Sequence, residues 1–108
     1  MTDYRVVLCT CPSNKEAQQL AQTLVEEALC ACVNIVGNVQ SIYRWEEKVC
    51  NDQEYLLVIK TSASSFNQLK SRMAELHSYD CPEIISLPID DGHAPYLEWI
   101  GAQIMDQT

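Results

Sequence analysis

Apolar positions along the chain change their spacing several times, and each change predicts a new structural element. Residues 4–10 are almost continuously apolar, as expected for a central strand that is covered on both faces. Pro12 ends this run, and the segment 13–16 (SNKE) has the capping-box pattern that begins a helix. The apolar face of that helix is formed by Ala17, Leu20, Ala21, Leu24, Val25 and Ala28.

The middle of the chain alternates with a period of two residues, which is typical of strands. Residues 33–45 form a long predicted strand, and Gly37 within it indicates a bulge or bend. The polar segment 46–53 is expected to turn the chain, and 55–61 then returns as an apolar strand, so the two strands should pair as a hairpin. The apolar side chains that share one parity along the first strand are Val33, Ile35, Val39, Tyr43 and Trp45.

The last third of the chain predicts a helix, a short strand and a closing helix. The serine-rich segment 62–65 can cap the first of these helices. Its buried stripe consists of Phe66, Leu69, Met73 and Leu76. After a polar loop, residues 83–89 form a short predicted strand, and Pro88 near its end suits a sheet edge. Tyr96, Ile100 and Ile104 mark the closing helix, with Pro95 in its first turn.

The predicted order is β-α-β-β-α-β-α. Its first six elements match the ferredoxin-like, or split βαβ, arrangement, which places the chain in the α+β class with an antiparallel sheet and an extra C-terminal helix. A length of 108 residues favours one domain, 1–108, without a linker or an internal repeat. This fold hosts many unrelated functions, so it leaves the role of the chain open.

Composition narrows the class of partner. The formal net charge is -8, and the chain has no Lys/Arg cluster that could bind nucleic acid or an anionic membrane. No apolar run reaches the roughly 18 residues of a membrane span, and the first residues do not resemble a signal peptide. We therefore expect a cytoplasmic chain without nucleic-acid or membrane partners, whose cysteines remain free thiols.

Two Cys-x-Cys pairs are the most conspicuous chemical feature of the sequence. Residues two apart on a strand point the same way, so Cys9 and Cys11 could present two sulfurs to one soft ion such as Cu(I) or Zn. Free cysteine also packs as a small apolar residue, and the spacing alone leaves both interpretations open. Packing explains Cys30 and Cys32 at the helix–strand junction, whereas Cys50 in the polar turn is expected to be exposed and oxidisable.

No catalytic constellation is present at the level of local motifs. The sequence lacks a nucleophile elbow, a P-loop and a zinc-protease motif. His77 lies at the predicted end of the second helix, where a cation is favoured by the helix dipole, and His93 lies in a loop that we expect to be solvated. These observations favour a protein that is not an enzyme.

Six segments together resemble the CutA divalent-cation-tolerance family. They run from Val6 to Ile100 and read VVLCTCP, LVEEALCACVNIV, SIYRWEEKV, YLLVIKT, YDCPEIISLPI and YLEWI. The resemblance implies a ferredoxin-like subunit of a tight cytoplasmic homotrimer that binds copper and other divalent cations and contributes to metal tolerance. It also implies that strands pair across subunits. The long strand 33–45 would supply such an edge, and an unpaired strand of this length independently calls for a partner.

The resemblance also implies metal ligands. In the family, the implied copper ligands are a cysteine at the end of the first strand and two adjacent histidines near the end of the second helix. Cys9 matches the cysteine and His77 matches the second histidine, but the first histidine position is Leu76 in this chain. Strand parity makes Cys11 our candidate for the missing ligand of a copper ion or another divalent cation.

A second candidate site follows from the place where the resemblance puts a cleft between subunits. An aromatic body with a few converging charges is typical of a small-molecule site, although interface packing with a buried Lys–Glu pair would use the same residues. The alternative function is thus a non-catalytic regulatory or scaffold trimer that binds a small molecule or a protein at this cleft. Its candidate residues are Tyr43, Trp45, Glu46, Lys60, Tyr79, Glu83 and Trp99.

Overall fold

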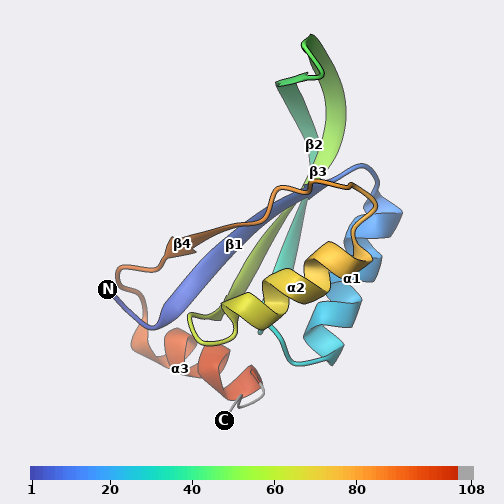
Figure 1. The fold of residues 1–108 in the computed structure, drawn as a ribbon. Helices are drawn as coiled ribbons and strands as arrows, with labels where there is room; N and C mark the ends of the chain where they lie inside the picture. Colours follow the sequence, from blue (N-terminus) through green and yellow to red (C-terminus); the bar gives the residue numbers. More distant parts are fainter. Residues whose placement is uncertain (105–108) are drawn as a thin grey trace.

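The computed structural model describes residues 1–104 and confirms the predicted order of elements (Figure 1). In chain order these elements are β1 (Tyr4–Cys11), α1 (Asn14–Glu26), β2 (Cys32–Trp45), β3 (Lys48–Ser62), α2 (Phe66–Leu76), β4 (Ile85–Pro88) and α3 (Ala94–Gln103). The strands form one sheet in the order β2-β3-β1-β4, with every neighbouring pair antiparallel. This is the α+β, ferredoxin-like arrangement that the sequence predicts.

Helices α1 and α2 cover one face of the sheet (Figure 1). The predicted cap of α1 is confirmed, because the Ser13 hydroxyl accepts the Glu16 backbone N–H at 3.1 Å. The apolar face of α1 is narrower than predicted, since Val25 is exposed. The core between helices and sheet contains Val7, Cys9, Cys11, Leu57 and Ile59 from the strands and Ala17, Leu20, Leu24, Leu69 and Met73 from the helices.

The edge strand β4 is shorter than predicted. It spans Ile85–Pro88 and not 83–89, because it pairs only with residues 5–8 of β1. Its position at the edge of the sheet agrees with the expectation from Pro88. Residues 78–83 lie in the segment that connects α2 to this edge strand.

The predicted eight-residue turn at 46–53 is wrong. Strands β2 and β3 pair as far as Trp45 and Lys48, so only Glu46 and Glu47 form the turn. Both residues have positive φ, 49° and 66°, as in the tight turns that suit twisted hairpins. The outer half of the hairpin projects from the sheet (Figure 1), and it exposes polar side chains together with the apolar and aromatic side chains of Ile42, Tyr43, Trp45 and Val49.

The bulge predicted at Gly37 is confirmed, and it has a consequence for the parity of β2. The register shifts between Val36 and Val39. Before the bulge Ile35 lies opposite Leu57, on the face covered by helices. Beyond it Val39 lies opposite Glu54, which belongs to the other face. Because of the bulge, the apolar residues that share one parity along this strand do not share one face of the sheet.

The second face of the sheet is not covered by α1 or α2. Apolar side chains on it include Val36, Ile85 and Leu87, each between 45% and 48% exposed. Helix α3 packs against its end near Tyr4, where a Cβ on Gly101 would lie only 2.6 Å from the Tyr4 hydroxyl. Among the described residues, no helix has the length and apolar character needed to cross a membrane.

Candidate functional site

The alternation of β1 places Cys9 and Cys11 on the face covered by helices, where both are fully buried. His77 follows the last residue of α2, and its imidazole is buried against the backbone of β1 at Thr10. The shared side of the two cysteines is thus confirmed, and the imidazole lies beside the strand that carries them. In residues 1–104, however, no three His, Cys, Asp or Glu side chains are arranged to hold a metal ion.

Both ring nitrogens of His77 already have protein partners. Nε2 lies 2.8 Å from the Thr10 carbonyl oxygen, and Nδ1 lies 3.1 Å from the Tyr79 backbone nitrogen. The carbonyl can only accept and the amide can only donate, so Nε2 carries the proton and Nδ1 offers its lone pair to Tyr79. A metal ion at His77 must displace one of these hydrogen bonds.

A carboxylate completes the surroundings of His77. Glu16 Oε2 lies 3.4 Å from His77 Nδ1 and accepts the Ser78 backbone N–H at 3.1 Å. The start of α1, the end of α2 and the first residues of the 78–83 segment are therefore held together by polar contacts around one imidazole. The immediate effect of this arrangement is to fix the path of the chain after α2.

The thiols at the candidate metal site are held in their protonated form. Burial, with smaller contributions from Cys11 and nearby carboxylates, raises the pKa of Cys9 to about 12. Burial likewise raises the pKa of Cys11 to about 11, and Glu16 adds to the shift. The Cys9 thiol donates to the Thr10 carbonyl at 3.7 Å and the Cys11 thiol to the Ser13 carbonyl at 3.6 Å. Because the thiolate is the metal ligand, metal binding here must release these protons.

The other cysteines occupy three different environments. All six are free thiols, in agreement with the prediction. Cys30 packs in the core, and burial raises its pKa to about 12. Cys32 is partly exposed, with its sulfur 3.9 Å from the Tyr96 hydroxyl. Cys50 lies in β3 and not in a turn, and it is half-buried where we predicted exposure. Cys81 is exposed.

A cavity of about 840 Å³, which we call the hairpin hollow, lies between the outer half of β2 and residues 78–83. Four of the predicted cleft residues, Tyr43, Trp45, Tyr79 and Glu83, line it. Glu46 lies in the adjacent hairpin turn. The remaining lining residues are Thr10, Gln40, Ser41, Ile42, Glu54, Ser78, Asp80 and Cys81.

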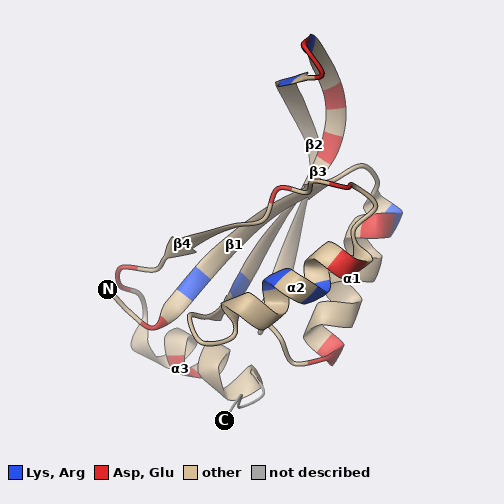
Figure 2. Ribbon diagram, in the orientation of Figure 1, with Lys and Arg blue, Asp and Glu red and all other residues tan. Residues whose placement is uncertain are grey.

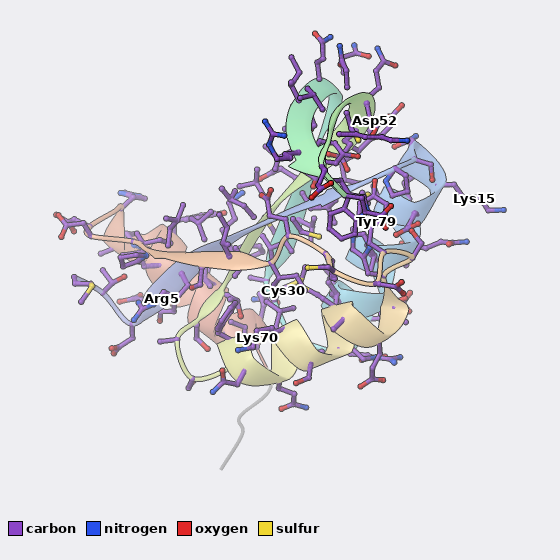
Figure 3. The ribbon with its side chains drawn as sticks, turned by 45° about the horizontal axis from the view of Figure 1, so that its top comes forward. Arg5, Lys15, Cys30, Asp52, Lys70 and Tyr79 are labelled. Carbon is purple, nitrogen blue, oxygen red and sulfur yellow. The ribbon has the colours of Figure 1, made fainter. Side chains whose placement is uncertain are left out.

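Two tyrosines of the hairpin hollow donate hydrogen bonds to carboxylates. The Tyr79 hydroxyl donates to Glu54 at 2.8 Å, and the Tyr43 hydroxyl donates to Asp52. Burial and the Glu54 carboxylate raise the pKa of Tyr79 well above its usual value, and the hydrogen bond to Asp52 raises the pKa of Tyr43 to about 12. Figure 3 shows Tyr79 at the base of the projecting hairpin, near Asp52. Both phenols therefore remain protonated at neutral pH.

The structure does not bring the other two predicted cleft residues to the hairpin hollow. Lys60 lies opposite Cys32 and Val6 on the open face of the sheet, and its ammonium group donates to Asn34. Trp99 lies on α3 and stacks on Tyr96, with ring centroids 5.6 Å apart. Within residues 1–104 of a single chain, Lys60 forms no ion pair with a glutamate.

Sequence reasoning missed Glu54. This residue is 7% exposed, lines the hairpin hollow and accepts the hydrogen bond of the Tyr79 hydroxyl. Its partner Tyr79 is 25 residues away, and no local pattern links the two. The available signal was its position directly before the apolar strand 55–61, where a carboxylate would need a hydrogen-bond donor if it were buried.

Comparison with known proteins decides the family. The sequence model of the family described as "CutA1 divalent ion tolerance protein" matches residues 5–103. The chain belongs to the CutA1 family. Its family name describes tolerance of divalent ions and does not name a catalysed reaction.

Similar proteins support this assignment along almost the whole chain. The divalent-cation tolerance protein CutA of Thermus thermophilus is 52% identical over 95 residues, which cover 88% of this chain and 92% of that protein. The chloroplastic protein CutA of Arabidopsis thaliana is 46% identical over 95 residues, but the match spans only 52% of its length. The crystal structure of CutA from Xylella fastidiosa has a TM-score of 0.94 at 36% identity, covering 96% of this chain and all of that one (100%). These CutA proteins confirm the resemblance seen in the sequence.

Proposed function

We propose that this chain acts as one CutA-like domain in a cytoplasmic homotrimer that binds copper or related divalent cations, contributes to metal tolerance and catalyses no reaction. The observation that carries the proposal is the match to the CutA1 divalent ion tolerance family over residues 5–103. The chemistry of the candidate donors favours a soft ion, since Cys9, Cys11 and His77 carry two sulfurs and one imidazole near the end of β1, but within residues 1–104 a metal ion would have to bring them together.

The sheet itself supports assembly. Val36, Ile85 and Leu87 leave nearly half of their surface exposed on a face that helices α1 and α2 do not cover. Strand β2 is also an edge strand of fourteen residues, and within residues 1–104 no other strand pairs with its outer side. A second copy of the chain can cover the apolar face and pair with this edge, and the proposed number of three copies follows from the family resemblance.

Metal binding at these residues costs free energy, because protein hydrogen bonds and thiol protons must be given up. A metal ion must remove the proton of at least one buried thiol and compete with the hydrogen bonds of His77. Binding should therefore release protons and become tighter as the pH rises. A metal ion bound at the exposed thiol of Cys81 would also displace a proton, so substitution of Cys9 distinguishes the buried donor set from adventitious binding there.

The test is a Cu(I) competition titration against a chromogenic chelator, with fully reduced protein. We expect one equivalent of copper per subunit, lost in Cys9→Ser and retained in Cys30→Ser, which removes an equally buried thiol outside the proposed donor set. The native mass of the same sample should be three times the 12.2 kDa of the chain. Equal copper binding by the native protein and Cys9→Ser would remove the metal site from this proposal.

The hairpin hollow favours a second function. Aromatic side chains and carboxylates line it together, and its volume lies in the usual range for small-molecule sites. In this alternative the protein is a non-catalytic regulatory or scaffold trimer that responds to a small molecule or a protein at the hairpin hollow. Copper would then bind only incidentally to thiols, and copper stoichiometry that survives loss of Cys9 would favour this function.

A further inference from the structure

The charged side chains that line the hairpin hollow are all acidic. Glu54, Asp80 and Glu83 line it, whereas no Lys, Arg or His is among its described lining residues. Figure 2 shows acidic positions along the projecting part of β3 and in the segment that leads to β4. With a formal net charge of -8 on the whole chain, the surrounding potential attracts cations and repels anions.

The carboxylates of the hairpin hollow are not arranged for an inorganic ion. In residues 1–104 no three acidic, histidine or cysteine side chains are arranged to hold a metal. One oxygen of Glu54 is already engaged by the Tyr79 hydroxyl. A divalent ion needs several oxygen ligands at short distance, whereas a cavity of about 840 Å³ leaves room for a molecule.

Aromatic side chains supply the second recognition element. In a single chain Tyr43 and Trp45 are 40% and 53% exposed, so ring surface is available to a ligand. The hydrogen bonds from Tyr43 to Asp52 and from Tyr79 to Glu54 hold two of the aromatic rings in place. The faces of such rings attract ammonium groups, and nearby carboxylates add to this attraction.

We propose that the hairpin hollow binds a small organic cation carrying one or more ammonium groups. The carboxylates of Asp80 and Glu83 neutralise the charge, and the rings of Tyr43 and Trp45 contact the cationic and aliphatic parts. The inference rests on the second function proposed above and names the ligand class of the same cavity. It is independent of the Cys9 and His77 donor set.

The two tryptophans of the chain provide a probe with an internal control. In protein labelled with 5-fluorotryptophan, Trp45 reports on the hairpin hollow and Trp99 reports on α3. We would titrate the assembled protein with butane-1,4-diamine at constant ionic strength and follow both ¹⁹F resonances, assigned with Trp45→Phe. The expected result is a saturable shift of Trp45 without a matching shift of Trp99.

A charge-removing pair of substitutions tests the role of the carboxylates. Asp80→Asn combined with Glu83→Gln should weaken diamine binding by about tenfold, because each removes one charge contact near the surface. Glu98→Gln removes one exposed carboxylate from α3 and should leave the affinity unchanged. Equal affinity of the double variant and the native protein would overturn the proposal.

Matched ligands separate failure of the cation proposal from failure of the second function. Butane-1,4-diol has the same chain without charge, succinate carries the opposite charge, and Mg²⁺ has charge without a carbon skeleton. Saturable binding of the diol or succinate in place of the diamine overturns the cation proposal but leaves a small-molecule site. An equal Trp45 shift with Mg²⁺ overturns it in favour of an inorganic site. If no probe shifts Trp45, both the cation proposal and the small-molecule form of the second function fail.

Discussion

The two candidate sites lie on opposite sides of the backbone around Thr10 and differ in how far their polar groups are satisfied. At Cys9, Cys11 and His77 the side chains are buried, and the structure supplies hydrogen-bond partners to the thiols and to both imidazole nitrogens. In the hairpin hollow, carboxylates and aromatic rings face a cavity of about 840 Å³. Residue types with affinity for a ligand are thus present in both places, but only the second is open before a ligand arrives.

The largest loss of stability should come from removing the imidazole of His77, which lies beside the buried cysteines of β1. His77→Ala deletes the contacts to Thr10 and Tyr79 and should lower the free energy of unfolding by about 1–3 kcal/mol, because buried polar groups lose their partners. His93→Ala is the matched control, since His93 makes no side-chain cap hydrogen bond and is exposed. Urea unfolding of the reduced assembly measures both. Equal stability of the two variants would mean that His77 is free for another role.

A smaller loss of stability should follow from removing the hydrogen bond between Tyr79 and Glu54 in the hairpin hollow. Tyr79→Phe leaves the Glu54 carboxylate without its donor and should destabilise the protein by about 1–2 kcal/mol. Tyr43→Phe removes a hydroxyl from a more exposed hydrogen bond and should destabilise the protein less than Tyr79→Phe does. Thermal or urea unfolding of both variants decides the matter. A larger loss in Tyr43→Phe would show that the hairpin contributes more to stability than its exposure indicates.

The smallest effect concerns the pH dependence of the buried thiols. Burial raises the pKa of Cys30 from 9.0 to about 12, so the folded state holds this proton more tightly than the unfolded chain. Its contribution is complete below pH 9.0 and is lost as the pH rises toward about 12. Between pH 8 and pH 10 the native protein should lose about 1 kcal/mol more stability than Cys30→Ala. Parallel pH profiles of the two proteins would contradict this assignment.

Much of the fold was predictable because its determinants are local. The alternation of β1 placed Cys9 and Cys11 on one face, and the SNKE motif located the start of α1. The length of β3 was not predictable in the same way, because its outer residues 48–53 are mostly exposed on both faces and therefore lack alternation. The bulge at Gly37 was expected, but its inversion of strand parity beyond Val36 becomes visible only from the register with β3.

By itself the sequence determined the order of elements, the α+β class and the family, since periodicity, capping residues and motifs are properties of neighbouring positions. Only the tertiary structure decided which side chains share a site. It placed Tyr79 against Glu54, separated Lys60 and Trp99 from the hairpin hollow, and closed His77 between Thr10 and Tyr79. The physical reason is that burial and hydrogen-bond partnership depend on residues brought together from distant parts of the chain.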